Sequence, residues 1–351
     1  MGILIHTTRI PAANASPWIM DTDDFLSMLN YGKSFVIGNE ARIRQGAVPP
    51  GRVRLRQWIM LQHFLAEQCQ GILFWTQHKA SVALETIERE HLLAPAELER
   101  LAQKVEVVYP TLPPGDGVKP TEGPLTIVYS GCTDQDKGGD IAWDVFLVLK
   151  QRYGEAVRLL YVGALPAGVK DRPPGIDVLP VVERQDYLAI LEEAHIFLSP
   201  TLRESYGLAL VEAASRGLDI LTTCGEGMRH VGELFVEREN ALFAPNEWPR
   251  QRKIAQLTEY AALLIDDRDL LQEMRQNNLR LVKSGKLSIA RRDSRLRHHY
   301  ARMQAALGRP YRPVTEALQE QYGLSQRDFE DDACWAQLLK RTQGRQVSIR
   351  V

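Results

Sequence analysis

Residues 199–217 read Ser-Pro-Thr-Leu-Arg-Glu-Ser-Tyr-Gly-Leu-Ala-Leu-Val-Glu-Ala-Ala-Ser-Arg-Gly. An apolar strand predicted over 195–199 ends here, and Gly207 opens an apolar helix predicted over 208–216. Glu204 lies in the turn before this helix, and Glu212 lies inside it among apolar residues, where a charge is costly unless a partner compensates it. These two carboxylates are therefore functional candidates. The alternative is a solvated turn residue and a salt-bridged helix residue.

The alternation of apolar strand and helix continues on both sides of this stretch. Further strands are predicted over 125–130, 157–162, 176–179 and 219–223, and further helices over 139–153 and 184–194. This alternation is typical of an α/β protein whose parallel sheet is covered by helices on both faces. Ligands of such sheets bind at the carboxyl ends of the strands, so we expect the site in the loops that follow the strands.

Two other loops at predicted strand ends are rich in glycine. Residues 129–139 read Tyr-Ser-Gly-Cys-Thr-Asp-Gln-Asp-Lys-Gly-Gly and lead into a helix, whose first N–H groups attract anions. Lys137 is placed to neutralise a phosphate there, although the spacing of a Walker loop is absent and a solvated lysine is the alternative. Residues 222–232 form a second glycine turn before a helix and can bring backbone N–H groups to the same place.

The chain of 351 residues is long enough for two domains. Residues 110–124 contain five prolines and three glycines, so we place the domain boundary there. We predict an N-terminal domain over 1–118, a C-terminal domain over 119–309 and a helical tail over 310–351. In the N-terminal domain, strands are predicted over 3–5, 18–20, 71–75 and 104–109, with a helix over 54–69. Residues 250–307 have a helical and basic pattern, and the tail has a further helical stretch over 332–341.

The composition disfavours several classes of protein. With 44% hydrophobic and 25% charged residues, the chain is close to the average soluble globular protein. The 43 Lys and Arg residues nearly balance the 44 Asp and Glu residues, which removes the electrostatic reason to expect nucleic-acid binding. The four cysteines lie far apart, so we expect reduced thiols rather than a zinc ribbon or a disulfide framework. Without a membrane-spanning run or a signal pattern, we expect a cytoplasmic protein, with the inner face of the membrane as a second possibility.

From residue 129 to about residue 242, several motifs in the right order resemble the donor-binding half of the family 4 glycosyltransferases. Glu204 and Glu212 correspond to the E-x₇-E element of that family, Lys137-Gly138 resembles its phosphate-binding K-G, and residues 224–240 resemble its glycine turn and following helix. In the N-terminal half the resemblance rests only on residues 17–21 and 105–110. The resemblance implies the GT-B fold, with two Rossmann-like domains whose parallel sheets face a cleft.

The resemblance also implies a function. The chain would transfer a sugar from a nucleotide-diphosphate donor to an acceptor hydroxyl with retention of configuration, and it would require no metal or other cofactor. Glu212 would bind the ribose hydroxyls, Glu204 would face the donor sugar, and Lys137 would neutralise the diphosphate. The complete donor-binding set would be Gly131, Lys137, Gly138, Glu204, Ser205, Tyr206, Gly207, Leu208 and Glu212.

One residue departs from the family pattern. An arginine usually follows the first glycine of the phosphate loop, and this chain has Cys132 there. A second cation from elsewhere would then have to assist Lys137 in binding the diphosphate. Arg203 and Arg229 are the candidates.

Asp21, Asp23 and Asp24 form an acidic run in the N-terminal domain. The run resembles the D-x-D element with which the other major glycosyltransferase fold holds a divalent metal, but acids before a helix more often cap it and interact with its dipole. Because the run follows a strand of the acceptor-side domain, we expect Asp23 or Asp24 to contact the acceptor hydroxyl, and Asp23 is our third catalytic candidate beside Glu204 and Lys137. His6 follows another strand and could face the same cleft.

A basic stretch without intervening acids contains Arg42, Arg44, Arg52, Arg54 and Arg56. It is either a solvated loop and helix start or a contact for the phosphate of a lipid-linked acceptor or for an anionic membrane surface. The acceptor itself would be a saccharide or a lipid-linked molecule. The sequence indicates neither the base nor the sugar of the donor.

The predicted N-terminal domain is short for this family, and its first strand resembles a middle one. We therefore expect its sheet to have an open edge or an open apolar face, and the chain to self-associate or to have a partner that covers it. A different function is also open. The chain could be a catalytically inactive GT-B module that binds a nucleotide or saccharide or supports a partner enzyme. A third reading, a nucleotide-sugar epimerase, is disfavoured by the E-x₇-E element.

Overall fold

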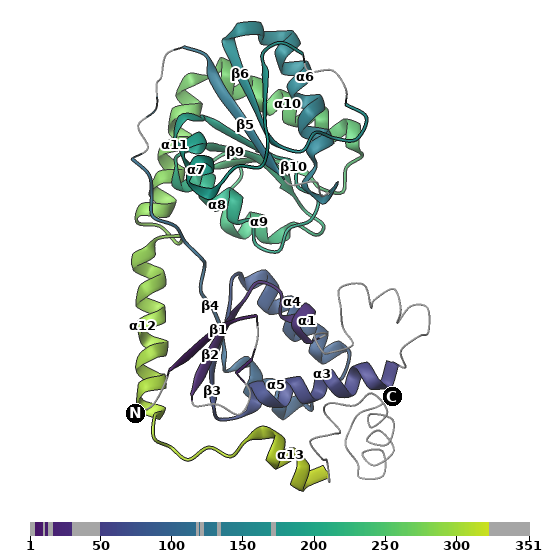
Figure 1. Cartoon of the computed structure of the whole chain (residues 1–351), viewed down its shortest axis with the longest axis vertical. Coiled ribbons are helices and arrows are strands. Elements are labelled where there is room, and N and C mark those ends of the chain that lie inside the picture. The colour runs from purple at the N-terminus through teal and green to yellow at the C-terminus, as the bar shows by residue number, and fades with distance from the viewer. Residues whose placement is uncertain are drawn as a thin grey trace. The chain divides into compact units, whose positions relative to one another are not determined.

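The computed structural model shows two compact units (Figure 1). It describes residues 4–9, 11–12, 17–29, 50–116, 119, 123–131, 135–169 and 173–322. The first unit combines the chain up to Val108 with the chain from Ser294 onward, and the second unit runs from Tyr109 to Asp293. The sequence placed these boundaries later, after residues 118 and 309. The second boundary differs because helix α12 (Ile289–Ala306) packs mostly on the sheet of the first unit.

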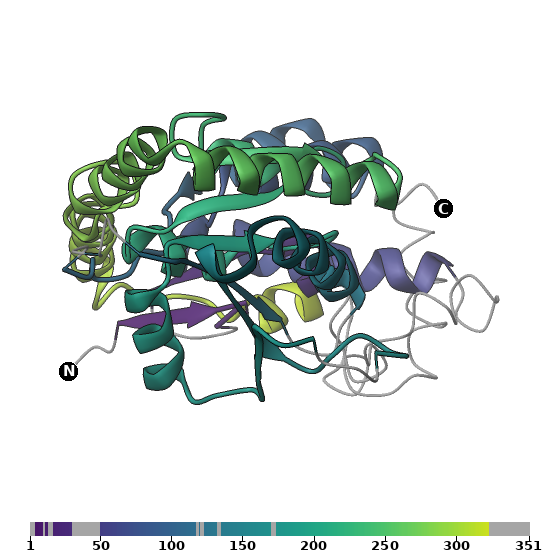
Figure 2. The same ribbon diagram turned by 90° about the horizontal axis from the view of Figure 1, so that it is seen from above.

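The described part of the second unit contains a parallel sheet with the strand order β10-β9-β8-β5-β6-β7. Its strands are β5 (Leu125–Gly131), β6 (Val157–Gly163), β7 (Ile176–Leu179), β8 (Ile196–Ser199), β9 (Asp219–Cys224) and β10 (Ala241–Pro245). Its helices are α6 (Gly139–Tyr153), α7 (Arg184–Glu193), α8 (Leu208–Ser215), α9 (Arg229–Leu234), α10 (Arg250–Asp266) and α11 (Arg268–Lys283) (Figures 1 and 2). The predicted parallel α/β sheet is therefore confirmed. Most of its element ends fall within one or two residues of the prediction.

The order of these strands decides where a site can form. The chain passes outward from β5 to β6 and β7, returns to β8 beside β5, and then continues outward through β9 and β10. Ile127 of β5 and Ile196 of β8 are register partners, and both are fully buried. Loops leaving the carboxyl ends of β5 and β8 therefore start side by side at the switch point, where open α/β sheets bind ligands.

The first unit is built on a smaller parallel sheet, β1-β2-β3-β4. Its strands are β1 (Ile5–Thr8), β2 (Trp18–Thr22), β3 (Cys69–Phe74) and β4 (Val105–Val107). One face carries Trp18 and Phe74, and it shares a core with α1 (Phe25–Leu29), α3 (Pro50–Leu65), α4 (Gln77–Arg89), α5 (Pro95–Ala102) and α13 (Val314–Tyr322). The other face carries Ile19 and Leu73, which pack against Met303 of α12.

Several element ends in this unit differ from the prediction, most of all those of α3 and β1. Helix α3 ends at Leu65 rather than at Cys69, because the Lys104 ammonium donates hydrogen bonds to the last carbonyls of the helix, those of Phe64 and Leu65 at 2.9 and 3.1 Å. A cation at a helix C-terminus satisfies carbonyls that have no helical partner. Strand β1 begins at Ile5, where the sequence predicted its end.

Among the described residues, β1 is an outer strand of this sheet, and its side chains at His6 and Thr8 are exposed. The open apolar face is not what the structure shows, because α12 covers Ile19 and Leu73. The predicted tail helix over 332–341 lies outside the described residues, and helix α13 precedes it. Across the described ranges, no helix combines the length and the apolar character that a membrane crossing requires.

Candidate functional site

Gly138 and Lys137 lie where the chain leaves β5 and enters α6. Gly138 precedes α6 with a φ of 65°, and a Cβ at this position would come within 2.0 Å of the carbonyl oxygen of Pro200. Only glycine therefore allows this helix start to approach the loop after β8 so closely. Gly131, the last residue of β5, opens the same loop, and Cys132 lies outside the described residues.

The loop after β8 brings Glu204 into contact with Lys137. Glu204 Oε2 lies 2.6 Å from Lys137 Nζ, and both side chains are partly exposed. The other carboxylate oxygen of Glu204 accepts the backbone N–H of Ser205 at 3.0 Å. The carbonyl of Asp136 fixes the loop by accepting the N–H of Leu202 at 2.7 Å. Two of the three predicted catalytic residues thus meet at the switch point.

Gly207 ends this loop and begins α8 with a φ of 95°. Tyr206 before it is buried, and its hydroxyl donates to the carbonyl of Pro110 at 2.8 Å. Burial raises the pKa of this hydroxyl well above its ordinary value, so it stays protonated as a donor. The Tyr206 side chain therefore holds the segment that enters the second unit. Its contribution to a ligand site would come from the backbone, next to the exposed Leu208.

Glu212 is buried on α8 and forms an ion pair that the sequence did not reveal. Its Oε1 lies 2.7 Å from Nη1 of Arg184, the first residue of α7. Only 8% of the Glu212 side chain is exposed, against 60% for Arg184. A buried carboxylate needs such a partner, so this contact matches the salt-bridge alternative and also leaves the carboxylate at the ligand end of the sheet. No sequence pattern at residue 184 distinguishes it from other surface arginines.

The third glycine loop joins the other two. Gly225 and Gly227 both have positive φ, 122° and 74°, and lead into α9. The Asn246 side-chain amide donates to the carbonyl of Glu226 at 2.6 Å and to that of Leu202 at 3.0 Å, which ties this loop to the one after β8. The expectation that three strand-end loops share one place is therefore met.

Arg203 and Arg229, the predicted second cations, both have exposed side chains on these loops. The structure adds a third basic residue at this end of the sheet, since Arg184 pairs with Glu212.

In the first unit, the predicted acceptor contact Asp23 is fully engaged. It is 1% exposed, and both of its carboxylate oxygens accept hydrogen bonds from Arg9. Asp21 is more accessible, lies 3.3 Å from His6 Nε2 and accepts the Trp75 indole N–H at 2.8 Å. Burial acts to raise the pKa of Asp21, but these hydrogen bonds outweigh it and lower the pKa below its ordinary value. Asp21 and His6, rather than Asp23, form the more open polar cluster of this unit.

The D-x-D reading gains no support from these contacts, because donors occupy the oxygens of Asp21 and Asp23. Within the described ranges, there is no group of three or more histidine, cysteine, aspartate or glutamate side chains that could hold a metal ion. In the basic stretch, Arg42 and Arg44 lie outside the described residues. Residues 52–56 are part of α3.

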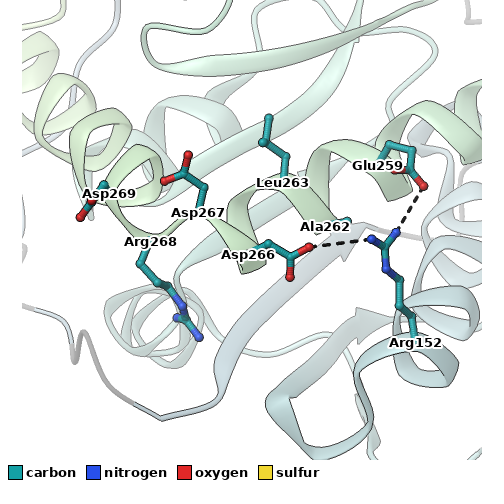
Figure 3. Close-up of a pocket in the computed structure, with 8 residues that line it drawn as sticks. All are labelled: Arg152, Glu259, Ala262, Leu263, Asp266, Asp267, Arg268 and Asp269. Atoms are coloured by element: carbon teal, nitrogen blue, oxygen red, sulfur yellow. Dashed lines mark hydrogen bonds and ion pairs between the residues drawn. The ribbon is translucent and has the colours of Figure 1, made fainter.

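The second unit also has a wide hollow of about 600 Å³ at the α10–α11 junction (Figure 3). Arg152 lies between Glu259 and Asp266 and forms ion pairs with both, at 3.4 and 3.8 Å. This hollow is near the end of α6 and the end of α10, hence at the amino ends of the strands. It lies at the opposite edge of the sheet from the three glycine loops and is not part of their site.

Comparison with known proteins supports a sugar-transferring domain. Residues 124–267 match the profile of the family described as Glycosyl transferases group 1, and this segment lies within the second unit and includes all three loops. No curated protein matches the chain.

Solved structures with similar folds cover both units. Sucrose-phosphate synthase from Thermosynechococcus elongatus is 14% identical with a TM-score of 0.54, and the match covers 86% of this chain and 74% of the other. An α,α-trehalose-phosphate synthase (UDP-forming) from Burkholderia vietnamiensis is 14% identical with a TM-score of 0.54, and the match covers 82% of this chain and 69% of the other. Alr3699/HepE from Anabaena, in complex with UDP and glucose, is 10% identical with a TM-score of 0.50 and coverage of 86% and 100%.

The chain has the GT-B fold. The expected fold class is thereby confirmed for both Rossmann-like units, and the second unit of this GT-B protein contains the segment that matches the glycosyltransferase group 1 model.

Proposed function

We propose that this GT-B protein is a family 4 type glycosyltransferase that moves a sugar from a nucleotide-diphosphate donor to an acceptor hydroxyl with retention of configuration. The observation that carries the proposal is the Lys137–Glu204 contact of 2.6 Å at the switch point of the second sheet. An ammonium beside a helix start suits the negative charge of a diphosphate, and a carboxylate next to it suits a sugar hydroxyl. Both residues lie inside the segment that matches the glycosyltransferase profile.

The site residues have separate tasks in this proposal. The start of α6 and the Lys137 ammonium neutralise the diphosphate and stabilise the charge that develops on it as the glycosidic bond breaks. Glu204 accepts hydrogen bonds from the donor sugar and holds Lys137 in place. Glu212 accepts hydrogen bonds from the two ribose hydroxyls, and Arg184 compensates its charge. One protein with this fold, Alr3699/HepE from Anabaena, is in complex with UDP and glucose, which together are the parts of such a donor.

In the first unit, the exposure of the polar side chains favours Asp21 and His6 over Asp23 as the acceptor contact. Asp23 is buried and pairs with Arg9, whereas the side chains of Asp21 and His6 are 22% and 29% exposed near the ends of β1 and β2, although each also has protein partners. We therefore propose Asp21 and His6 as the contacts for an acceptor hydroxyl of a saccharide or lipid-linked molecule.

A donor panel tests the proposal. UDP-, GDP- and ADP-sugars are added to the full chain in a thermal-shift assay, since a ligand that binds only the native state raises its melting temperature. Donor hydrolysis and transfer to sugar acceptors are then measured with the best binder. We expect binding and turnover, both unchanged by EDTA. Complete loss with EDTA that Mn²⁺ restores would contradict the metal-independent mechanism.

The inactive GT-B module remains the second candidate, because Arg9 neutralises one predicted catalytic residue, Asp23. The two functions separate in the same experiment. Binding of a nucleotide sugar without hydrolysis or transfer would establish the module and overturn the enzyme.

A further inference from the structure

A second hollow in the second unit lies where the first glycine loop begins, at Ser130 and Gly131. It has a volume of about 270 Å³ and is lined by Ser130, Gly131, Val162, Val181, Val182, Arg184 and Tyr187. Ser130 and Gly131 belong to the end of β5 and Val162 to the end of β6, so the hollow opens at the ligand edge of the sheet. Its valines offer apolar walls, and its arginine and two hydroxyls offer polar groups.

The Arg184–Glu212 ion pair connects this hollow to the proposed ribose site. Arg184 lines the hollow and its Nη1 lies 2.7 Å from Glu212 Oε1. In the proposed function, on which this inference rests, Glu212 binds the ribose of the donor. The base is bonded directly to the ribose, so a nucleotide held at Glu212 places its base within reach of the Arg184 guanidinium.

Among the polar side chains of the hollow, Arg184 can only donate hydrogen bonds, whereas the hydroxyls of Ser130 and Tyr187 can donate or accept. A guanidinium carries five N–H groups and no acceptor, and the contact with Glu212 uses only Nη1. Burial, together with the charge of Glu212, raises the pKa of the Tyr187 hydroxyl, which therefore stays protonated. The free N–H groups of the guanidinium pair with acceptors such as carbonyl oxygens. The fork of an arginine fits the O6 and N7 acceptors of guanine, whereas adenine sets an amino donor beside N7.

We propose that Arg184 selects the nucleobase of the donor and favours a base with a ring carbonyl oxygen, as in uracil or guanine, over adenine. A site built to donate hydrogen bonds rejects a ligand that cannot accept them, because its polar groups would be left unpaired. The high exposure of Arg184 supports a role in binding rather than in folding, since ion pairs with an exposed partner contribute little to stability.

The test compares the affinities of UDP, GDP and ADP for the full chain by titration calorimetry. In the wild type, we expect UDP or GDP to bind at least about tenfold more tightly than ADP, the effect of one hydrogen bond to a charged group. Arg184→Gln should reduce this ratio to near unity, and Arg184→Lys should retain part of it. Arg158→Gln is the matched control, because Arg158 is an exposed arginine of the same unit that pairs with Asp177 at 3.0 Å.

The ratio between bases separates recognition from positioning. If Arg184 only holds Glu212, its loss weakens all three nucleotides equally and the ratio stays at its wild-type value, which overturns the inference. Tightest binding of ADP by the wild type, or equal binding of all three, also overturns it while the proposed function stands. Failure of all three nucleotides and of every nucleotide sugar to bind would instead remove the proposed function and this inference with it. Melting temperatures of the variants verify that they are folded.

Discussion

Replacing Glu212 with alanine should abolish donor binding with little effect on the fold. The carboxylate would accept hydrogen bonds from two ribose hydroxyls, and a hydrogen bond to a charged group contributes about 1.5–3 kcal/mol. Losing both removes about 3–6 kcal/mol, which corresponds to a donor affinity about 10²-fold to 10⁴-fold weaker.

The effect of Glu212→Ala on stability should be much smaller. Arg184, the partner of Glu212, is 60% exposed and can be solvated once the carboxylate is gone. Such a pair contributes about 0–1 kcal/mol, and alanine is the best helix former for a position inside α8. We therefore expect the free energy of unfolding to change by less than about 1 kcal/mol.

The measurement uses the nucleotide sugar that raises the wild-type melting temperature most. Calorimetry gives the affinity of each variant, and thermal unfolding without ligand gives its stability. Glu259→Ala is the control, since it removes another ion-paired carboxylate, that of α10 with Arg152, at the opposite edge of the sheet. Wild-type affinity in a folded Glu212→Ala variant would refute the ribose role. A loss of stability above about 3 kcal/mol without ligand would refute the argument that the pair is a binding feature.

Three further outcomes are expected. Lys137→Ala should lower kcat at least as much as it lowers donor affinity. It should cost no more than about 1 kcal/mol of stability, because the contact with Glu204 is partly exposed. An unchanged kcat would exclude a catalytic role for Lys137. Tyr206→Phe removes the 2.8 Å hydrogen bond to the carbonyl of Pro110 and should cost about 1 kcal/mol in a denaturant titration, and no loss would show that this contact is not stabilising. Burial lowers the pKa of His63 from 6.5 to about 4. As the pH falls, His63 is therefore protonated in the unfolded chain before it is protonated in the folded chain. The free energy of unfolding should fall by about 3 kcal/mol between pH 6.5 and pH 4. In His63→Leu this pH dependence should be weaker, and an identical pH profile in both proteins would contradict the assignment.

The second unit was largely predictable because its signals are local. Apolar strands such as Ile196–Ser199 and the glycine at 207 determine where an element begins or ends, whatever the rest of the chain does. The position of Glu204 and Lys137 at the ligand edge was also predictable, since both follow strands of a parallel sheet. Their contact at 2.6 Å was not, because it depends on β8 lying next to β5.

The first unit was less predictable because its signals are spread along the chain. Helix α12 has a basic, amphipathic sequence, and nothing in its pattern says which sheet its Met303 packs against. The predicted domain boundary followed the proline-rich segment, and the predicted second domain over 119–309 therefore included this helix. In the structure, the residues of α12 from Ser294 onward belong to the first compact unit.

The sequence by itself determined the α/β class, the three glycine loops and the residue types that a donor site needs. The tertiary structure decided which charges meet: Arg9 with Asp23, and Arg184 with Glu212. Both pairs join segments that have no common local pattern, so only the order and packing of strands and helices bring them together. A buried carboxylate is costly without a cationic partner. Arg9 contacts both oxygens of Asp23 and makes it a structural residue, whereas Arg184 contacts one oxygen of Glu212 and leaves this acid at the ligand edge.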